Sequence, residues 1–234
     1  MARGLDPRTV GPLLVLIAHD LRNPLSALHS NVGFLESATE PEDQDVREAL
    51  SDITVSCSSL NQIIDNLELL GIANLEEPPK LDRLPLRIEE LARECVARAQ
   101  TSAASYGAAL QLVTASGTNA YVLVHREMAG RALGNLLFNA IQHGSGSAVL
   151  VTVRREEQHG VVAITDSGAV LAPSLREAAF TAAGQLVCKG NAEGRYSRGL
   201  GLFAADVAAR LAGAELKCTT ADGKNVLEFW APLA

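Results

Sequence analysis

Two long apolar seams near the start of the chain constrain its fold more than any other feature. In each seam, apolar residues recur at alternating steps of three and four, which places their side chains on one stripe of an α-helix. Pro41 and a cluster of acidic residues lie between the seams and suit the start of a second helix. The pattern predicts a helical hairpin over residues 10–74. Its seams are Ala18, Leu21, Leu25, Leu28, Val32 and Leu35, then Val46, Leu50, Ile53, Cys57, Leu60, Ile64 and Leu67.

Two helices alone bury too little apolar surface to be stable, so the seams also predict a partner. The simplest partner is a second copy of the chain, which completes a four-helix bundle as a homodimer. Periodicity alone fits any other helical hairpin or coiled coil equally well, and that alternative stays open at this point.

The chain changes character after a polar, proline-containing linker over residues 74–85. Short predicted strands then alternate with amphipathic helices, and Asp222–Gly223 marks the turn of a closing hairpin. Segregated helices and strands predict a two-layer α/β sandwich, so the fold class is α+β. We expect a first domain at 1–76 and a second at 77–234. The predicted helices are 87–100, 127–143 and 201–213, and the predicted strands are 108–115, 120–125, 147–157, 160–168 and the two arms of 214–232.

Composition excludes several classes of function. A net charge of −7 gives no support for binding nucleic acid or an anionic membrane. The four cysteines lack CxxC spacing, which argues against a zinc site or a disulfide framework and favours a reducing, cytoplasmic location. The longest early apolar run, residues 13–18, is far too short to cross a bilayer, so no membrane span is expected in this chain.

A histidine and an aspartate lie side by side in the first predicted helix. His19 is on the flank of the seam, where solvent reaches it, and an exposed imidazole is a competent nucleophile near neutral pH. Asp20 could accept its proton or orient its ring. Asn23 lies one turn further on the same face, and Pro24 removes a backbone hydrogen bond and bends the helix. A surface histidine on a coiled coil is the alternative interpretation.

Two asparagines four residues apart lie on one face of the helix predicted at 127–143. Paired amide oxygens, as at Asn135 and Asn139, can hold Mg²⁺ and meet nucleotide phosphates, because hard cations take oxygen ligands. Capping or surface asparagines would give the same pattern. The pair is therefore a candidate cation site only in combination with other features.

Two glycine-containing segments follow. Asp166 ends an apolar strand, where a carboxylate can accept a hydrogen bond from an exocyclic amine, and Gly168 lets the backbone approach a flat base. Gly199 and Gly201 precede a helix, whose first amides favour phosphate. Each motif alone also fits an ordinary turn or loop.

In this order, the four segments resemble the transmitter core of a bacterial sensor histidine kinase. "HDLRNPL" from His19 resembles the H-box, "NLLFNAIQH" from Asn135 the N-box, "DSG" from Asp166 the first glycine box, and "RGLGL" from Arg198 the second. The resemblance implies a HisKA-type dimerisation and phosphotransfer domain followed by a divergent Bergerat-type ATP-binding domain.

The resemblance also implies an activity. An ATP-dependent protein-histidine kinase would autophosphorylate His19, with ATP and Mg²⁺ as cofactors, and pass the phosphoryl group to an aspartate of a response regulator receiver domain. Asp20 would be the acid/base partner of His19, and Asn23 the amide used in dephosphorylating the regulator. Asn139 would ligate the metal. The implied ATP-binding residues are Asn135, Asn139, Gln142, His143, Asp166, Gly168, Arg198, Gly199, Leu200 and Gly201.

The chain departs from the family pattern at several positions. Val170 and Ser197 replace glycines, and Gln142 replaces a lysine that would meet phosphate. These departures predict nucleotide binding that is weaker or unusually arranged, and they leave open a degenerate phosphotransfer or scaffold module with little ATP use. Related ATPases that hydrolyse ATP carry a glutamate where Asn135 stands, which favours transfer to His19 over hydrolysis.

Overall fold

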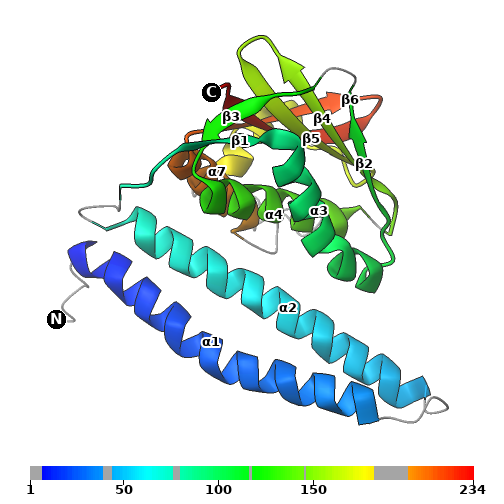
Figure 1. Cartoon of the computed structure of the whole chain (residues 1–234). Coiled ribbons are helices and arrows are strands. Elements are labelled where there is room, and N and C mark those ends of the chain that lie inside the picture. The colour runs from blue at the N-terminus through cyan, green and yellow to red at the C-terminus, as the bar shows by residue number, and fades with distance from the viewer. Residues whose placement is uncertain (1–6, 39–43, 76–79, 116–117, 145, 182–199) are drawn as a thin grey trace. The chain divides into compact units, whose positions relative to one another are not determined.

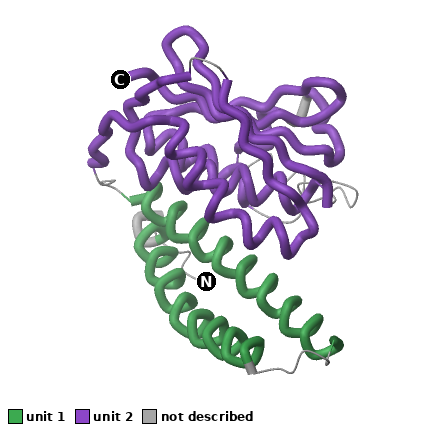
Figure 2. The backbone as a smooth tube through the Cα atoms, turned by 45° about the vertical axis from the view of Figure 1, so that its right-hand side comes forward, with its two compact units in different colours: residues 1–79 green, residues 80–234 purple. Residues whose placement is uncertain are grey.

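Two long helices, α1 (Pro7–Ala38) and α2 (Gln44–Ala73), form the hairpin that the seams predict (Figure 1). The computed structural model describes residues 7–38, 44–75, 80–115, 118–144, 146–181 and 200–234. The chain divides into two units, residues 1–79 and 80–234 (Figure 2). Helix α1 continues through Pro12 and Pro24, so the proline expected to bend the helix does not end it.

Each seam divides into two rows, and only one row packs inside the hairpin. On α1 the members seven residues apart at Ala18, Leu25 and Val32 are buried, and on α2 the corresponding buried residues are Leu50, Cys57 and Ile64. Ala18, Leu25, Cys57 and Ile64 form one cluster, with Leu67 packed against it. The alternate members remain exposed on the hairpin surface. They are Leu21, Leu28 and Leu35 on α1, and Val46, Ile53 and Leu60 on α2.

Near the start of α1 the two helices approach to backbone contact. A Cβ atom at Gly71 would lie 2.8 Å from Val15 Cγ2 and 2.9 Å from the carbonyl oxygen of Gly11. A Cβ atom at Gly11 would lie 2.8 Å from the carbonyl oxygen of Asn74. Any side chain larger than that of glycine would therefore push the helices apart at this end.

The second unit is a two-layer sandwich, in which one face of a five-stranded sheet is covered by helices (Figure 1). The strand order is β2-β4-β5-β7-β6, with β2 parallel to β4 and the other neighbours antiparallel. The fold class expected from the sequence is thus confirmed as a helical hairpin followed by an α/β sandwich. The helices are α3 (Ile88–Ser105), α4 (Arg126–His143) and α7 (Gly201–Ala212), with short α5 (Pro173–Arg176) and η1 (Ala178–Phe180). The strands are β2 (Leu110–Thr114), β4 (Val149–Glu156), β5 (His159–Asp166), β6 (Glu215–Ala221) and β7 (Lys224–Pro232).

A second, two-stranded sheet lies where the sequence predicts only linker. Strand β1 (Leu84–Arg87) pairs antiparallel with β3 (Tyr121–Val124), so the expectation that the linker extends to residue 85 is wrong. Pro85 hid this strand, because proline is tolerated only at sheet edges and in bulges. The sheet packs on β5, since a Cβ atom at Gly160 would lie 2.7 Å from Val122 Cγ1.

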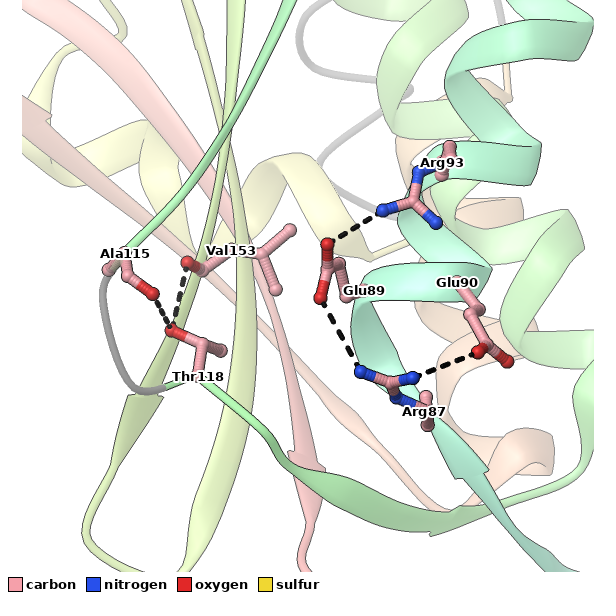
Figure 3. A network of polar contacts seen from close by, with 7 residues as sticks. All are labelled: Arg87, Glu89, Glu90, Arg93, Ala115, Thr118 and Val153. Carbon is pink, nitrogen blue, oxygen red and sulfur yellow. Dashed lines mark hydrogen bonds and ion pairs between the residues drawn. The ribbon is translucent and has the colours of Figure 1, made fainter.

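Ion pairs fix the junction between β1 and α3 (Figure 3). Arg87, the N-cap residue of α3, lies 3.4 Å from Glu90 Oε1 and 4.0 Å from Glu89 Oε2. Glu89 also accepts a hydrogen bond of 2.7 Å from Arg93. Acidic residues in a first helical turn are favourable because they face the positive end of the helix dipole.

In the loop before β3, Thr118 Oγ1 donates to the carbonyl oxygen of Ala115 at 2.7 Å.

Helices α4 and α7 pack against each other, and both carry small buried residues. Ala129 and Ala132 on α4, and Ala205 and Ala208 on α7, are all fully buried. The core of this unit is built mainly from alanine and aliphatic residues, with Phe229 fully buried among them, in keeping with a chain that is only 4% aromatic. Within the described residues, none of the helices combines the length and apolar character that crossing a bilayer requires.

Candidate functional site

His19 and Asp20 lie together on the outer surface of α1. Their side chains are 70% and 71% exposed, and His19 Nδ1 is 3.6 Å from Asp20 Oδ1. This distance is longer than that of a good hydrogen bond, but it allows the carboxylate to attract a proton on the ring. With Nδ1 toward Asp20, Nε2 is the ring nitrogen that a reactant from solvent can reach.

Arg22 ties the two helices together one turn from His19. Its Nη2 donates to Asp65 Oδ1 at 2.8 Å and to Glu68 Oε2 at 3.2 Å, both on α2. The hydrogen bond to Asp65 raises the pKa of the guanidinium group. Ion pairs this exposed contribute less than about 1 kcal/mol each, so their main effect is to fix the rotation of α1 against α2. Sequence reasoning missed this role, because Arg22 and its partners are more than forty residues apart.

Asn23 is exposed on α1, one turn beyond His19. Both side chains therefore reach solvent on the outer part of the hairpin, as their spacing predicts. The phospho-acceptor candidate His19, its acid/base candidate Asp20 and the amide candidate Asn23 all lie in the first unit, and the nucleotide candidates lie in the second.

The two α4 asparagines differ in how their amides are satisfied. Asn135 is only 4% exposed, and its Nδ2 donates to the carbonyl oxygen of Arg131 at 3.0 Å. Asn139 Oδ1 is buried and has no hydrogen-bond partner among the described residues. An unsatisfied buried acceptor costs about 1–3 kcal/mol. A ligand or metal ion that met this oxygen would recover the cost.

The first turn of α7 lies beside Asn135. Leu200 is the N-cap residue of α7, and a Cβ atom at Gly201 would lie 3.8 Å from Asn135 Oδ1, an ordinary contact distance. The start of α7 and the α4 amides thus form one region, where the helix N-terminus favours a negatively charged group. Two predicted residues of this loop, Arg198 and Gly199, and the divergent Ser197, lie outside the described residues.

Asp166 ends β5, as predicted, and is 1% exposed. Its Oδ1 accepts a hydrogen bond of 2.8 Å from the backbone N–H of Gly168, which is also buried. This bond closes the Asp-Ser-Gly turn as an Asx-type turn. The turn therefore holds the carboxylate in place at the end of β5.

Asn225 on β7 holds the segment after this turn, and sequence reasoning missed it. It is fully buried, and it lies directly opposite Asp166 in the β5–β7 ladder. Its Nδ2 donates to the carbonyl oxygen of Ala169 at 2.9 Å, and its Oδ1 accepts from the N–H of Leu171 at 2.9 Å. Its partners are more than fifty residues away in the sequence, so no local signal indicates this role.

The remaining predicted residues are more open. Gln142 and His143 are half-buried in the last turn of α4, within about one turn of Asn139. Val170, which stands at a position where the family pattern has glycine, is 47% exposed. Among the described residues, no group of three or more His, Cys, Asp or Glu side chains is arranged to hold a metal ion.

Two family models match the chain, one on each unit. Residues 14–74 match the His Kinase A (phospho-acceptor) domain. Residues 125–234 match the histidine kinase-, DNA gyrase B- and HSP90-like ATPase.

Relatives and solved structures point in the same direction. Sensor histidine kinase ZraS of Salmonella typhi is 25% identical over 228 residues, covering 96% of this chain and 46% of the relative. Sensor-type histidine kinase PrrB of Mycobacterium tuberculosis H37Rv is 25% identical over 196 residues, covering 84% and 42%. The chain thus spans less than half the length of these relatives.

The crystal structure of full-length ShkA in complex with AMPPNP superposes with a TM-score of 0.66 at 19% identity, covering 96% of this chain and 46% of that one. At this identity the likeness shows the fold alone. The two matched models, their order along the chain and the named relatives identify the chain as a two-component transmitter core of the sensor histidine kinase type.

Proposed function

We propose that this chain is an ATP-dependent protein-histidine kinase that autophosphorylates His19 and passes the phosphoryl group to an aspartate of a response regulator. Residues 1–76 would form the dimerisation and phosphotransfer domain, and residues 77–234 the catalytic ATP-binding domain. The observation that carries the proposal is the buried Oδ1 of Asn139, which has no partner among the described residues and lies one helical turn beyond Asn135, whose own Oδ1 is beside the start of α7.

The described residues fit a magnesium–nucleotide complex. Asn139 offers a neutral oxygen ligand, which suits a hard cation that keeps most of its coordination for phosphate oxygens and water. The first amides of α7, beside Asn135, suit the phosphate chain. Asp166, held by Gly168, suits an exocyclic amine of the base. When bound, Mg²⁺ would neutralise charge on the phosphates.

The transfer step assigns a task to each residue of the hairpin site. Nε2 of His19 attacks the γ-phosphorus, a P–N bond forms, and the bond from that phosphorus to the β,γ-bridging oxygen breaks to release ADP. The ring gives up its Nδ1 proton toward Asp20, whose carboxylate is 3.6 Å away. Exposure of both side chains leaves room for the catalytic domain and later for the receiver domain.

The second transfer moves the phosphoryl group from His19 to the carboxylate of a receiver-domain aspartate. The P–N bond breaks, and a P–O bond to the aspartate forms. Asn23, exposed one turn from His19, would orient water when the regulator is dephosphorylated. The remaining residues of the expected ATP site, Gln142, His143, Arg198, Gly199 and Leu200, stay assigned by resemblance.

The exposed row of the hairpin supports the homodimer. Leu21 and Leu28 on α1, with Ile53 and Leu60 on α2, repeat at heptad spacing and are each at least 40% exposed. Their burial against the same row of a second copy completes a four-helix bundle. Gln142 and Val170 depart from the family pattern, but no contact among the described residues adds support to the degenerate scaffold alternative.

Autophosphorylation with γ-labelled ATP and Mg²⁺ tests the proposal. The unmutated chain should take up an acid-labile label, His19→Ala should abolish it, and Asn139→Ala should lower both labelling and nucleotide affinity. His29→Ala is a matched control, because His29 is also exposed on α1. Asn119→Ala, at an exposed asparagine before β3, is the control for Asn139.

Two results would contradict the proposal. An unmutated chain that neither takes up label nor binds nucleotide in calorimetry is not a kinase. Label that persists in His19→Ala would place the acceptor at another residue.

A further inference from the structure

Arg22, which links α1 to α2, is also a surface neighbour of His19. Residues three apart on a helix have Cβ atoms about 5–6 Å apart, so these two side chains can meet. The hydrogen bonds from Arg22 to Asp65 and Glu68 both come from Nη2. Nε and Nη1 take no part in those two bonds, so the guanidinium group has a second edge at which an anion can bind.

Within the described helices of the hairpin, Arg22 is the one arginine or lysine close to His19. The arginines of α1 and α2 are Arg8, Arg22 and Arg47, and neither helix contains lysine. Arg8 lies eleven residues before His19, which is about 16 Å along a helix axis. Arg47 lies eighteen residues before Asp65, the partner of Arg22, which is about 27 Å. Among these residues, only Arg22 can therefore reach an anionic group carried by His19.

A phosphoryl group on His19 would compete with α2 for Arg22. It brings up to about two negative charges to Nε2, on the ring edge away from Asp20, whose carboxylate is 3.6 Å from Nδ1. The ion pair to Asp65 is weak because the two side chains are 37% and 51% exposed, and the pair to Glu68 is longer, at 3.2 Å. Arginine and phosphate instead form two parallel charge-assisted hydrogen bonds. The phosphoryl group is therefore the stronger partner for the guanidinium group.

We propose that Arg22 changes partners when His19 is phosphorylated, leaving Asp65 and Glu68 to bind the phosphoryl oxygens. This inference rests on the proposed role of His19 as the phospho-acceptor. Before transfer, Arg22 fixes the rotation of α1 against α2, and after transfer it holds the phosphoryl group for the receiver domain. The same exchange removes the ion-pair link between the helices at this level, so phosphorylation loosens the hairpin next to His19.

Chemical phosphorylation tests the exchange without relying on kinase activity. Phosphoramidate transfers its phosphoryl group to an imidazole nitrogen and releases ammonia. The full chain carries His29→Ala for this purpose, because His29 is also exposed on α1, and mass spectrometry confirms the phosphoryl group on His19. In NMR spectra of the isotope-labelled chain, the Nε–H signal of Arg22, identified by its absence in Arg22→Lys, should move downfield on phosphorylation. The Nε–H signal of Arg47, an exposed arginine of α2, is the control and should not move.

Two sets of variants separate phosphoryl binding from a purely structural link. Asp65→Asn combined with Glu68→Gln breaks the link from the α2 side and leaves Arg22 able to bind the phosphoryl group, so the downfield shift should persist. Arg22→Gln should move the titration midpoint of the phosphohistidine phosphorus signal upward by about half a pH unit or more, because a nearby positive charge favours the ionised form. Arg47→Gln is the matched control and should leave that midpoint unchanged.

Three results would overturn the inference. They are an Arg22 Nε–H signal that stays in place on the phosphorylated chain, a downfield shift that is lost in the Asp65→Asn, Glu68→Gln variant, and a titration midpoint that Arg22→Gln leaves unchanged. A chain that takes up no label from ATP would instead overturn the kinase function. The chemically phosphorylated chain would still decide whether Arg22 binds the phosphoryl group.

Discussion

The side-chain amide of Asn225 on β7 donates a 2.9 Å hydrogen bond to the carbonyl oxygen of Ala169, which lies after β5 and is distant in the sequence. Its own oxygen accepts from Leu171, so this single buried residue holds the segment that follows Asp166. The position of the Asp166 carboxylate therefore depends on a residue of β7 as well as on its own turn.

Asn225→Ala should weaken nucleotide binding. The change leaves the backbone groups of Ala169 and Leu171 without their partner, at a cost of about 1–3 kcal/mol shared between stability and binding. Titration calorimetry with a non-hydrolysable ATP analogue measures the binding part, and thermal unfolding measures the rest. Asn119→Ala should change neither. If Asn225→Ala bound the ATP analogue with unaltered affinity, the segment after Asp166 would not support the base of the nucleotide.

Leu28→Glu should convert the dimer into monomers while leaving the hairpin folded. Leu28 is 45% exposed, so replacing its side chain removes few contacts within one chain. A carboxylate buried between two copies, however, is strongly unfavourable. Sedimentation velocity measures the change. Leu25→Ala provides the contrast, because Leu25 is 6% exposed and its loss should lower the unfolding free energy by about 2–5 kcal/mol. A Leu28→Glu chain that stays dimeric would exclude this row as the interface.

Arg22→Ala should slow autophosphorylation clearly, while it lowers the stability of the hairpin only slightly. The ion pairs to Asp65 and Glu68 are exposed, and their loss should cost less than about 1 kcal/mol each in unfolding free energy. Loss of the link lets α1 rotate against α2, which displaces His19. Label uptake and thermal unfolding, measured on the same samples, separate the two effects. A loss of stability with unchanged labelling rate would contradict this role.

Asp206→Asn should make the stability of the chain less dependent on pH. Asp206 lies in α7 at 9% exposure, and burial raises the pKa of its carboxyl above the usual 3.8, although Arg210 partly opposes the shift. The folded state therefore binds this proton more tightly than the unfolded state. Its stabilising contribution is complete below the unfolded pKa and is lost as pH rises through the higher folded value.

Thermal unfolding of Asp206→Asn from acidic to neutral pH checks this sign. Relative to the unmutated chain, the variant should gain stability as pH rises above 3.8 and then level off. A relative gain in Asp206→Asn that grows toward low pH would show that the carboxylate is stabilised in the folded state.

Sequence patterns predict the elements whose cause is local. Heptad spacing predicts the hairpin, and Asp222–Gly223 predicts the closing turn, where both residues adopt positive φ. Which row of each seam turns inward is not local information, because both rows consist of apolar residues. The strand at Leu84–Arg87 also escaped prediction, since its pairing with Tyr121–Val124 is what overcomes the presence of Pro85.

Within the candidate site, the same division holds. Asp166 lies at the end of β5 and Gly201 at the start of α7, as the sequence pattern predicts. The supporting contacts of Arg22 and Asn225 depend on partners from other elements, and only the folded chain brings these together.

The backbone contact between Gly11 and Gly71 has a mechanical consequence. Elsewhere in the hairpin, side chains separate the helices and can change rotamer to absorb a small displacement. At Gly11 the two main chains touch, so no rotamer change is available there. A displacement or rotation of the start of α1 is therefore transmitted directly to α2. The hairpin is therefore rigid at this end and more easily deformed along the rest of its length.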